Sequence, residues 1–148
     1  MLIGIDPALS PELLAALAAM GHGDELCLAD AHFPAASTAG GGRLIRLPGL
    51  DGPRVLTAIL SVLPLDTFVA TPAAVMAVVG TAEREPEVVA RYCELLERAV
   101  GRSVVPERLE RFAFYERARA AFAIVATGER RTYGNLLLRK GLVQGGAP

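Results

Sequence analysis

Apolar positions near the start of the chain recur at the spacing of a helix. Ser10, Pro11 and Glu12 combine an N-cap, a proline at the first helical position and an acid in the first turn. Leucines follow at intervals of three and four residues. We therefore predict a helix that begins at Pro11 and ends at Gly21.

The middle of the chain alternates between apolar runs of strand length and stretches with helical spacing. Pro72 interrupts the β-branched stretch 67–79, so we expect one or two strands there rather than a continuous one. In chain order we predict a strand at 26–29, a loop at 31–42, a strand at 43–47, a helix from 51–53 to its exit at 65–66, and a helix at 86–100.

The last third of the chain adds two helical segments and two strands. Pro106 opens a short helical turn, and we predict a further helix at 115–121. A turn that begins at Thr127 separates strands at 123–126 and 135–139. Helices that alternate with short apolar strands predict an α/β fold, a three-layer α/β/α sandwich with a central sheet.

Composition narrows the class of protein and of partner. A length of 148 residues matches one domain, 1–148, and a hydrophobic share of 52% predicts a well-packed core. The 15 basic and 16 acidic residues leave a net charge of -1, which argues against nucleic acid or an anionic membrane as partner. A small neutral ligand suits this balance best.

The cysteines and the N-terminus indicate the compartment. Cys27 and Cys93 stand far apart without the close pairing of a zinc or redox motif, so we expect free, buried thiols. The N-terminus lacks the basic region and apolar run of a signal peptide, and no stretch reaches membrane-spanning length. We therefore expect a cytoplasmic protein with no membrane segment.

His22 is the candidate for acid–base chemistry, because an unperturbed imidazole exchanges protons near neutral pH. It follows the predicted end of the first helix, and Gly21 and Gly23 permit an unusual backbone path towards a pocket. A helix-capping or merely exposed histidine is the structural alternative. His22 and His32 have no third ligand at convincing spacing, so we expect no metal site.

Polar side chains at predicted element ends are candidates for ligand binding. Asp30 lies where the strand 26–29 ends, and ligands of open α/β sheets gather at such ends. Asp66 has a similar position, with helix capping as its alternative. Tyr133 and Asn135 are separated by one residue, so in an extended segment both side chains project to the same face.

Several longer motifs follow one another along the whole chain. They are Met20-Gly21-His22-Gly23-Asp24-Glu25, Asp30-Ala31-His32-Phe33-Pro34-Ala35, Arg111-Phe112-Ala113-Phe114-Tyr115-Glu116-Arg117-Ala118, Thr127-Gly128-Glu129 and Tyr133-Gly134-Asn135. Together they resemble the RbsD/FucU family, and most closely its L-fucose mutarotase branch. The segment 79–105 carries the least resemblance.

The resemblance implies an RbsD-like α/β/α fold, no cofactor, and a ring-shaped homo-oligomer, a decamer, with active sites near subunit contacts. It implies His22 as the catalytic residue. The substrate-binding residues that it implies are Asp30, Asp66, Arg111, Tyr115, Tyr133 and Asn135. Core packing is the alternative for Tyr115, and a surface ion pair is the alternative for Arg111.

The implied activity is the interconversion of the α and β anomers of L-fucose through acid–base-assisted opening and closing of the sugar ring. The stretch 112–117 and Gly134, where D-ribose pyranases tend to carry alanine, favour this branch. Two alternatives stay open. One is exchange between the pyranose and furanose forms of D-ribose, and the other is a sugar-binding protein without turnover.

Overall fold

Capping side chains fix the starts of two helices where the sequence predicted them. The computed structural model describes residues 2–80 and 85–143. Helix α1 (Pro11–Ala19) begins at Ser10, whose hydroxyl accepts from the Leu13 amide at 3.2 Å. Helix α3 (Gly52–Leu60) begins at Asp51, whose carboxylate accepts from the Arg54 amide at 2.8 Å. The predicted N-cap at Ser10 and the predicted helix start at 51–53 are both confirmed.

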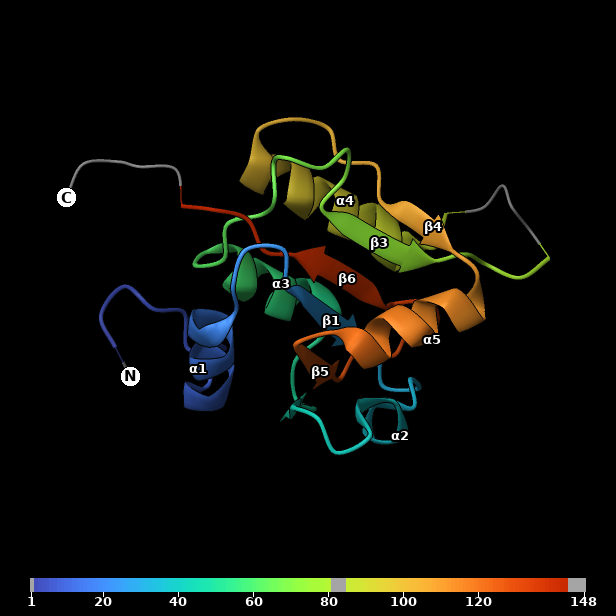
Figure 1. Cartoon of the computed structure of the whole chain (residues 1–148), viewed down its shortest axis with the longest axis horizontal. Helices are drawn as coiled ribbons and strands as arrows, with labels where there is room; N and C mark the ends of the chain where they lie inside the picture. The colour runs from blue at the N-terminus through green and yellow to red at the C-terminus, as the bar shows by residue number, and fades with distance from the viewer. Residues whose placement is uncertain (1, 81–84, 144–148) are drawn as a thin grey trace.

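A six-stranded mixed sheet forms the centre of the described structure, with the order β2-β5-β1-β6-β3-β4 (Figure 1). Strand β6 runs antiparallel to its neighbours β1 and β3, whereas the pairs β1–β5, β2–β5 and β3–β4 are parallel. The strands are β1 (Glu25–Ala29), β2 (Leu44–Leu47), β3 (Ala73–Met76), β4 (Glu107–Leu109), β5 (Ala123–Thr127) and β6 (Leu136–Arg139).

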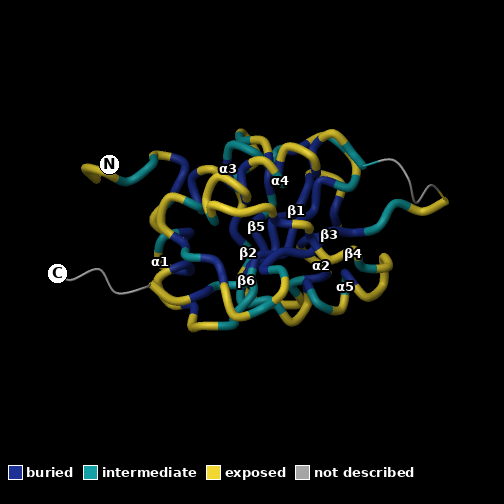
Figure 2. The backbone as a smooth tube through the Cα atoms, turned by 90° about the horizontal axis from the view of Figure 1, so that it is seen from above, coloured by how far each residue is buried: buried dark blue, intermediate teal, exposed yellow. Residues whose placement is uncertain are grey.

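Helices cover both faces of this sheet, so the predicted three-layer α/β/α sandwich is confirmed. Helices α1, α3 and α4 (Glu87–Val100) pack on one face through alternate strand residues such as Leu26 and Leu28. Helices α2 (Ala35–Ala39) and α5 (Arg111–Ala120) pack on the other face, around Cys27 and Phe114. Figure 2 shows the buried strands between α3 and α4 on one side and α5 on the other.

Two of the predicted elements are wrong. The segment 31–42 is not only a loop, because α2 forms within it and ends at Gly40 with a left-handed φ of 55°. No side chain caps α2, so its burial against the sheet and α5 stabilises it. The predicted helical turn after Pro106 is instead the strand β4, which pairs with β3 in a parallel register.

Other elements differ from the prediction at their boundaries. Helix α5 begins at Arg111 rather than at residue 115, because the Glu110 carboxylate accepts from the Phe112 amide at 2.8 Å and caps the helix. Of the stretch 67–79, only Ala73–Met76 is a strand.

The thiols are free, with Cys27 buried and Cys93 half-buried, and burial raises the pKa of both. Among the helices of segments 2–80 and 85–143, none has the length and apolar character needed to cross a membrane.

Candidate functional site

The predicted site residues divide into two groups at opposite ends of the central strands. His22 precedes β1 and Asp30 follows it, while Asn135 precedes the antiparallel β6. Asp66 joins the His22 end, because its amide donates to the carbonyl of Arg139 at 3.0 Å. One copy of the chain therefore does not bring His22 to Asp30 and Asn135.

A cavity of about 240 Å³ lies at the Asp30 end of the sheet. It collects five of the predicted residues from segments that are far apart in the sequence. The residues that line it are Asp30, His32, Phe33, Met76, Val79, Arg111, Tyr115, Thr132, Tyr133 and Asn135. The cavity is therefore the part of the predicted site that a single chain assembles.

Asp30 and Asn135 form the buried floor of this cavity, and each side chain is only 4% exposed. The Asp30 amide donates to the Asn135 Oδ1 atom, and the Asn135 Nδ2 atom donates to Asp30 Oδ2, both at 2.9 Å. The Gly134 amide also donates to Asp30 Oδ2, at 3.1 Å. The other oxygen, Oδ1, accepts from the His32 amide at 2.9 Å. A carboxylate oxygen accepts more than one hydrogen bond, so Oδ1 retains capacity for a ligand hydroxyl.

Two tyrosine hydroxyls on the cavity wall accept hydrogen bonds from the protein. Tyr115 accepts from the Arg111 Nε atom at 3.1 Å, and this bond raises the pKa of Arg111. Tyr133 accepts from the Val79 amide at 3.4 Å. Because each oxygen accepts from nitrogen, its own proton stays free to donate to a ligand.

The backbone of Tyr133 differs from the extended segment that we predicted. Tyr133 has a φ of 61°, the only left-handed value at a non-glycine residue in the described chain. It nevertheless lines the same cavity as Asn135. Tyr133 and Asn135 therefore face the same cavity because of a left-handed turn at Tyr133, and not because side chains alternate along an extended strand.

At the opposite end of the sheet, His22 and Asp66 form a pair. The His22 Nε2 atom lies 3.3 Å from Asp66 Oδ1, and Asp66 is 2% exposed. The Phe68 amide donates to the same oxygen at 2.9 Å, and Arg139 Nε lies 3.4 Å from Oδ2. The Phe68 amide, followed by His22 and Arg139, holds the pKa of Asp66 below its ordinary value. An ionised Asp66 can orient the His22 ring.

The loop that carries His22 is tied to the end of β6. Lys140 donates from its Nζ atom to the carbonyls of Leu17 and Met20 at 2.8 and 2.6 Å, which satisfies the C-terminus of α1. Gly23 has a φ of 86°, so the predicted unusual backbone path is present there. These contacts hold His22 next to β1, with 42% of its side chain exposed.

Several cavity residues were absent from the predicted site. His32, to which the sequence assigns no role in sugar binding, lines the cavity, and its Nε2 atom lies 3.2 Å from the Arg130 carbonyl. Met76 ends β3 at the same sheet edge as Asp30, so the rule that located Asp30 applies to it as well. Within the described residues, no three His, Cys, Asp or Glu side chains are grouped so as to hold a metal ion.

Comparison with known proteins shows the family of this chain. Residues 3–143 match the sequence model of the RbsD / FucU transport protein family. The chain belongs to this family. This membership agrees with the α/β fold of the chain.

Members of the RbsD / FucU family with similar sequences cover nearly the whole chain. The fucose mutarotase of Mus musculus is 52% identical over 142 residues, which are 93% of this chain and 92% of the mouse protein. The crystal structure of FucU from Bifidobacterium longum has a TM-score of 0.90 and 42% identity, and covers 95% of this chain and 99% of its own. The fucose mutarotase of Streptococcus pneumoniae, solved in complex with L-fucose, has a TM-score of 0.87 and 40% identity, and covers 97% of this chain and 100% of its own.

Proposed function

We propose that this protein is a fucose mutarotase, an isomerase that interconverts the α and β anomers of L-fucose. The observation that carries the proposal is the cavity around Asp30 and Asn135, in a chain about half identical to fucose mutarotases along its length. At about 240 Å³, this cavity lies below the range of roughly 300–1,000 Å³ typical of drug-sized ligands and suits a single monosaccharide.

The chemistry of the cavity matches a neutral polyhydroxylated ligand. The carboxylate of Asp30 accepts from sugar hydroxyls, and the hydroxyl protons of Tyr115 and Tyr133 donate to them. Phe33 and Val79 provide apolar surface for the C–H face of a sugar ring. A monosaccharide is therefore the ligand class that this cavity supports best.

Mutarotation needs a proton removed from the anomeric hydroxyl and a proton delivered to the ring oxygen. The ring then opens to the aldehyde, the carbonyl face turns, and the reverse transfers close the ring. A positioned acid or base accelerates such a step about 10²–10⁴-fold, which lowers the barrier by about 2.7–5.5 kcal/mol. His22, oriented by Asp66, is the residue that we assign to these transfers.

The separation of His22 from the cavity supports an active site shared between copies of the chain. His22 and Asp66 lie at one end of β1 and the cavity lies at the other, so a head-to-tail contact between copies joins the two groups. A closed ring satisfies this contact for every copy. We infer a homo-oligomeric ring, a decamer in the cytoplasm, in which each copy supplies His22 to the cavity of a neighbour.

Saturation-transfer NMR tests the activity directly. With L-fucose, the purified protein should transfer saturation between the α and β anomeric signals faster than buffer alone. An exchange rate equal to that in buffer contradicts the proposal. D-ribose is the control substrate, and faster exchange with ribose than with fucose would instead assign the pyranase activity.

Mixing two inactive variants tests the shared site. His22→Gln removes the proton-transfer group, and Tyr133→Ala removes a cavity wall at the other end of the sheet. Rings assembled from both variants should regain activity in about a quarter of the sites, since each site needs two intact contributors. Absence of recovery in rings that native mass spectrometry shows to be mixed would refute sharing between copies.

A further inference from the structure

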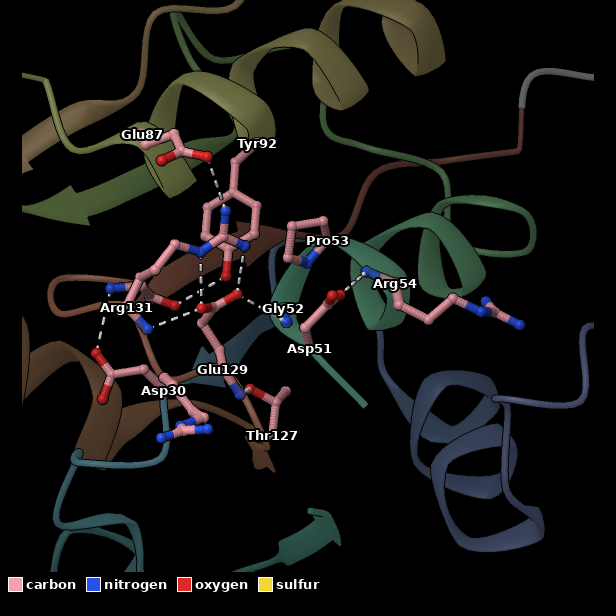
Figure 3. Close-up of polar contacts among 12 residues, drawn as sticks. Asp30, Asp51, Gly52, Pro53, Arg54, Glu87, Tyr92, Thr127, Glu129 and Arg131 are labelled. Carbon is pink, nitrogen blue, oxygen red and sulfur yellow. Dashed lines mark hydrogen bonds and ion pairs between the residues drawn. The ribbon is translucent and has the colours of Figure 1, made fainter. Parts of the chain in front are cut away.

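A buried carboxylate lies behind the cavity without forming any part of its wall. Glu129 is 2% exposed, and its Oε1 atom accepts from the amide and the Nε atom of Arg131 at 2.8 and 2.9 Å. Its Oε2 atom accepts from Arg131 Nη2 at 2.7 Å and from the Gly52 amide at 3.3 Å. Figure 3 shows these groups converging between β5 and the start of α3. One carboxylate thus ties the start of the 129–135 loop to the start of α3 and to Arg131 within the same loop.

A second buried group reaches the same loop from α4. Tyr92, on α4, is fully buried, and its hydroxyl donates to the Gly134 carbonyl at 2.9 Å. Burial raises the pKa of Tyr92, so the hydroxyl remains a neutral donor. A Cβ atom at Gly52 would lie 1.9 Å from the Tyr92 hydroxyl oxygen. Glycine at position 52 therefore creates the space in which this hydroxyl reaches the loop.

Both backbone polar groups of Gly134 are consequently held by buried side chains. Its amide donates to Asp30, its carbonyl accepts from Tyr92, and a Cβ at this position would lie 2.8 Å from the Glu129 Cγ atom. The residues on either side, Tyr133 and Asn135, both line the cavity. Tyr133 has a left-handed backbone, a conformation that persists only where the surroundings enforce it.

We propose that Tyr92 and Glu129 are positioning residues of the active site. Tyr92 acts through its hydrogen bond to the Gly134 carbonyl, and Glu129 acts through its hydrogen bonds to Arg131 in the same loop. Together they set the directions of the Tyr133 hydroxyl and the Asn135 amide in the cavity. Neither residue lines the cavity. The role in catalysis rests on the proposed mutarotase function, whereas the hold of these two residues on the 129–135 loop rests on the hydrogen bonds alone.

Tyr92→Phe tests this proposal because it removes one hydroxyl and keeps the buried ring. The control is Val89→Ala, which opens a cavity in the core on the same helix and removes no hydrogen-bonding side-chain group. A displacement of about 1 Å in a reacting group costs about 10²-fold in rate. We expect kcat for fucose exchange to fall about 10–100-fold in Tyr92→Phe and to stay within about twofold in Val89→Ala, at equal folded fractions.

Amide hydrogen exchange gives a second readout that does not depend on activity. In Tyr92→Phe, the Gly134 amide should exchange at least about tenfold faster relative to the amides of β1, because the Gly134 carbonyl loses its fixed partner and the backbone of this residue is held at one end only. In Val89→Ala, any change in exchange rate should be the same for the Gly134 amide and for the amides of β1. Equal relative protection of Gly134 in the two variants overturns the proposal.

The two readouts separate this inference from the proposed function. If the wild-type protein does not exchange fucose anomers, the mutarotase assignment fails and the hydrogen-exchange comparison still decides the role of Tyr92 in holding the loop. If the wild type is active but Tyr92→Phe and Val89→Ala have equal kcat, the assigned catalytic positioning is wrong.

Discussion

Replacing Gly134 with alanine should damage the active site more than it damages the fold. A Cβ at this position would lie 2.8 Å from Glu129 Cγ, 3.1 Å from the Arg131 carbonyl oxygen and 3.3 Å from Asp30 Cβ. Ordinary carbon–carbon contacts lie at about 3.5–4.0 Å, so Glu129 or the loop must move by about 0.7–1.2 Å. The loop carries Tyr133 and Asn135, and the displacement therefore reaches the cavity.

The effect of this substitution on stability is small because two contributions oppose each other. Overpacking a well-filled site costs about 1–3 kcal/mol. Alanine also restricts the unfolded chain, which favours folding by about 0.4–1 kcal/mol. The φ of Gly134 is not left-handed, so alanine meets no backbone penalty there. We expect a net loss of about 0–2.6 kcal/mol in the free energy of unfolding.

The effect on activity should be larger, at about 10²-fold in the rate of anomer exchange, because the cavity groups shift by about 1 Å. Denaturant unfolding and saturation-transfer NMR measure the two quantities on one preparation. Gly49→Ala is the matched control, since it makes the same change to the unfolded chain and no atom lies within 4 Å of the added Cβ. Exchange rates in Gly134→Ala and Gly49→Ala that agree within twofold would refute the reasoning.

Three further predictions concern single side chains. Tyr133→Phe removes a hydroxyl that donates into the cavity, so exchange should slow about two- to tenfold, and a wild-type rate in NMR counts against the assignment. Asp66→Asn removes the carboxylate beside His22 and should slow exchange about tenfold or more while fucose binding persists; loss of binding without loss of kcat contradicts this role. Arg131 holds the pKa of Glu129 below its ordinary 4.5. The stabilising contribution of ionised Glu129 is therefore complete above pH 4.5 and is lost as pH falls through the lower, folded-state pKa. Unfolding measurements should show a constant stability gap between wild type and Glu129→Gln from pH 6 to 8 that narrows below pH 4.5, and a gap independent of pH would disprove the linkage.

Local sequence signals predicted the elements whose cause is local. The caps at Ser10 and Asp51 act on amides three residues away, so short-range chemistry alone identifies the starts of α1 and α3. The same reasoning failed for α2 and β4. Helix α2 has no side-chain cap, and β4 depends on pairing with β3, about thirty residues earlier in the chain.

In the candidate site, too, local residue types predicted some features and contacts between distant segments decided the others. The residue types at Asp30, Tyr133 and Asn135 indicated a polar ligand site, and the structure brings them to one cavity. The sequence contained no sign that Tyr92 reaches Gly134, because the contact joins a helix in the poorly matching segment 79–105 to a loop 42 residues away.

The sequence by itself determined the α/β class, the capped helices and the family, because these follow from short-range patterns and from motifs read in order. Only the tertiary structure decided where the site residues lie. His22 and Asp30 lie at opposite ends of β1. Contacts from α4 to Gly134 and from α3 to Glu129 hold the loop that carries Tyr133 and Asn135. These relations depend on contacts between distant segments, which no local pattern of residues encodes.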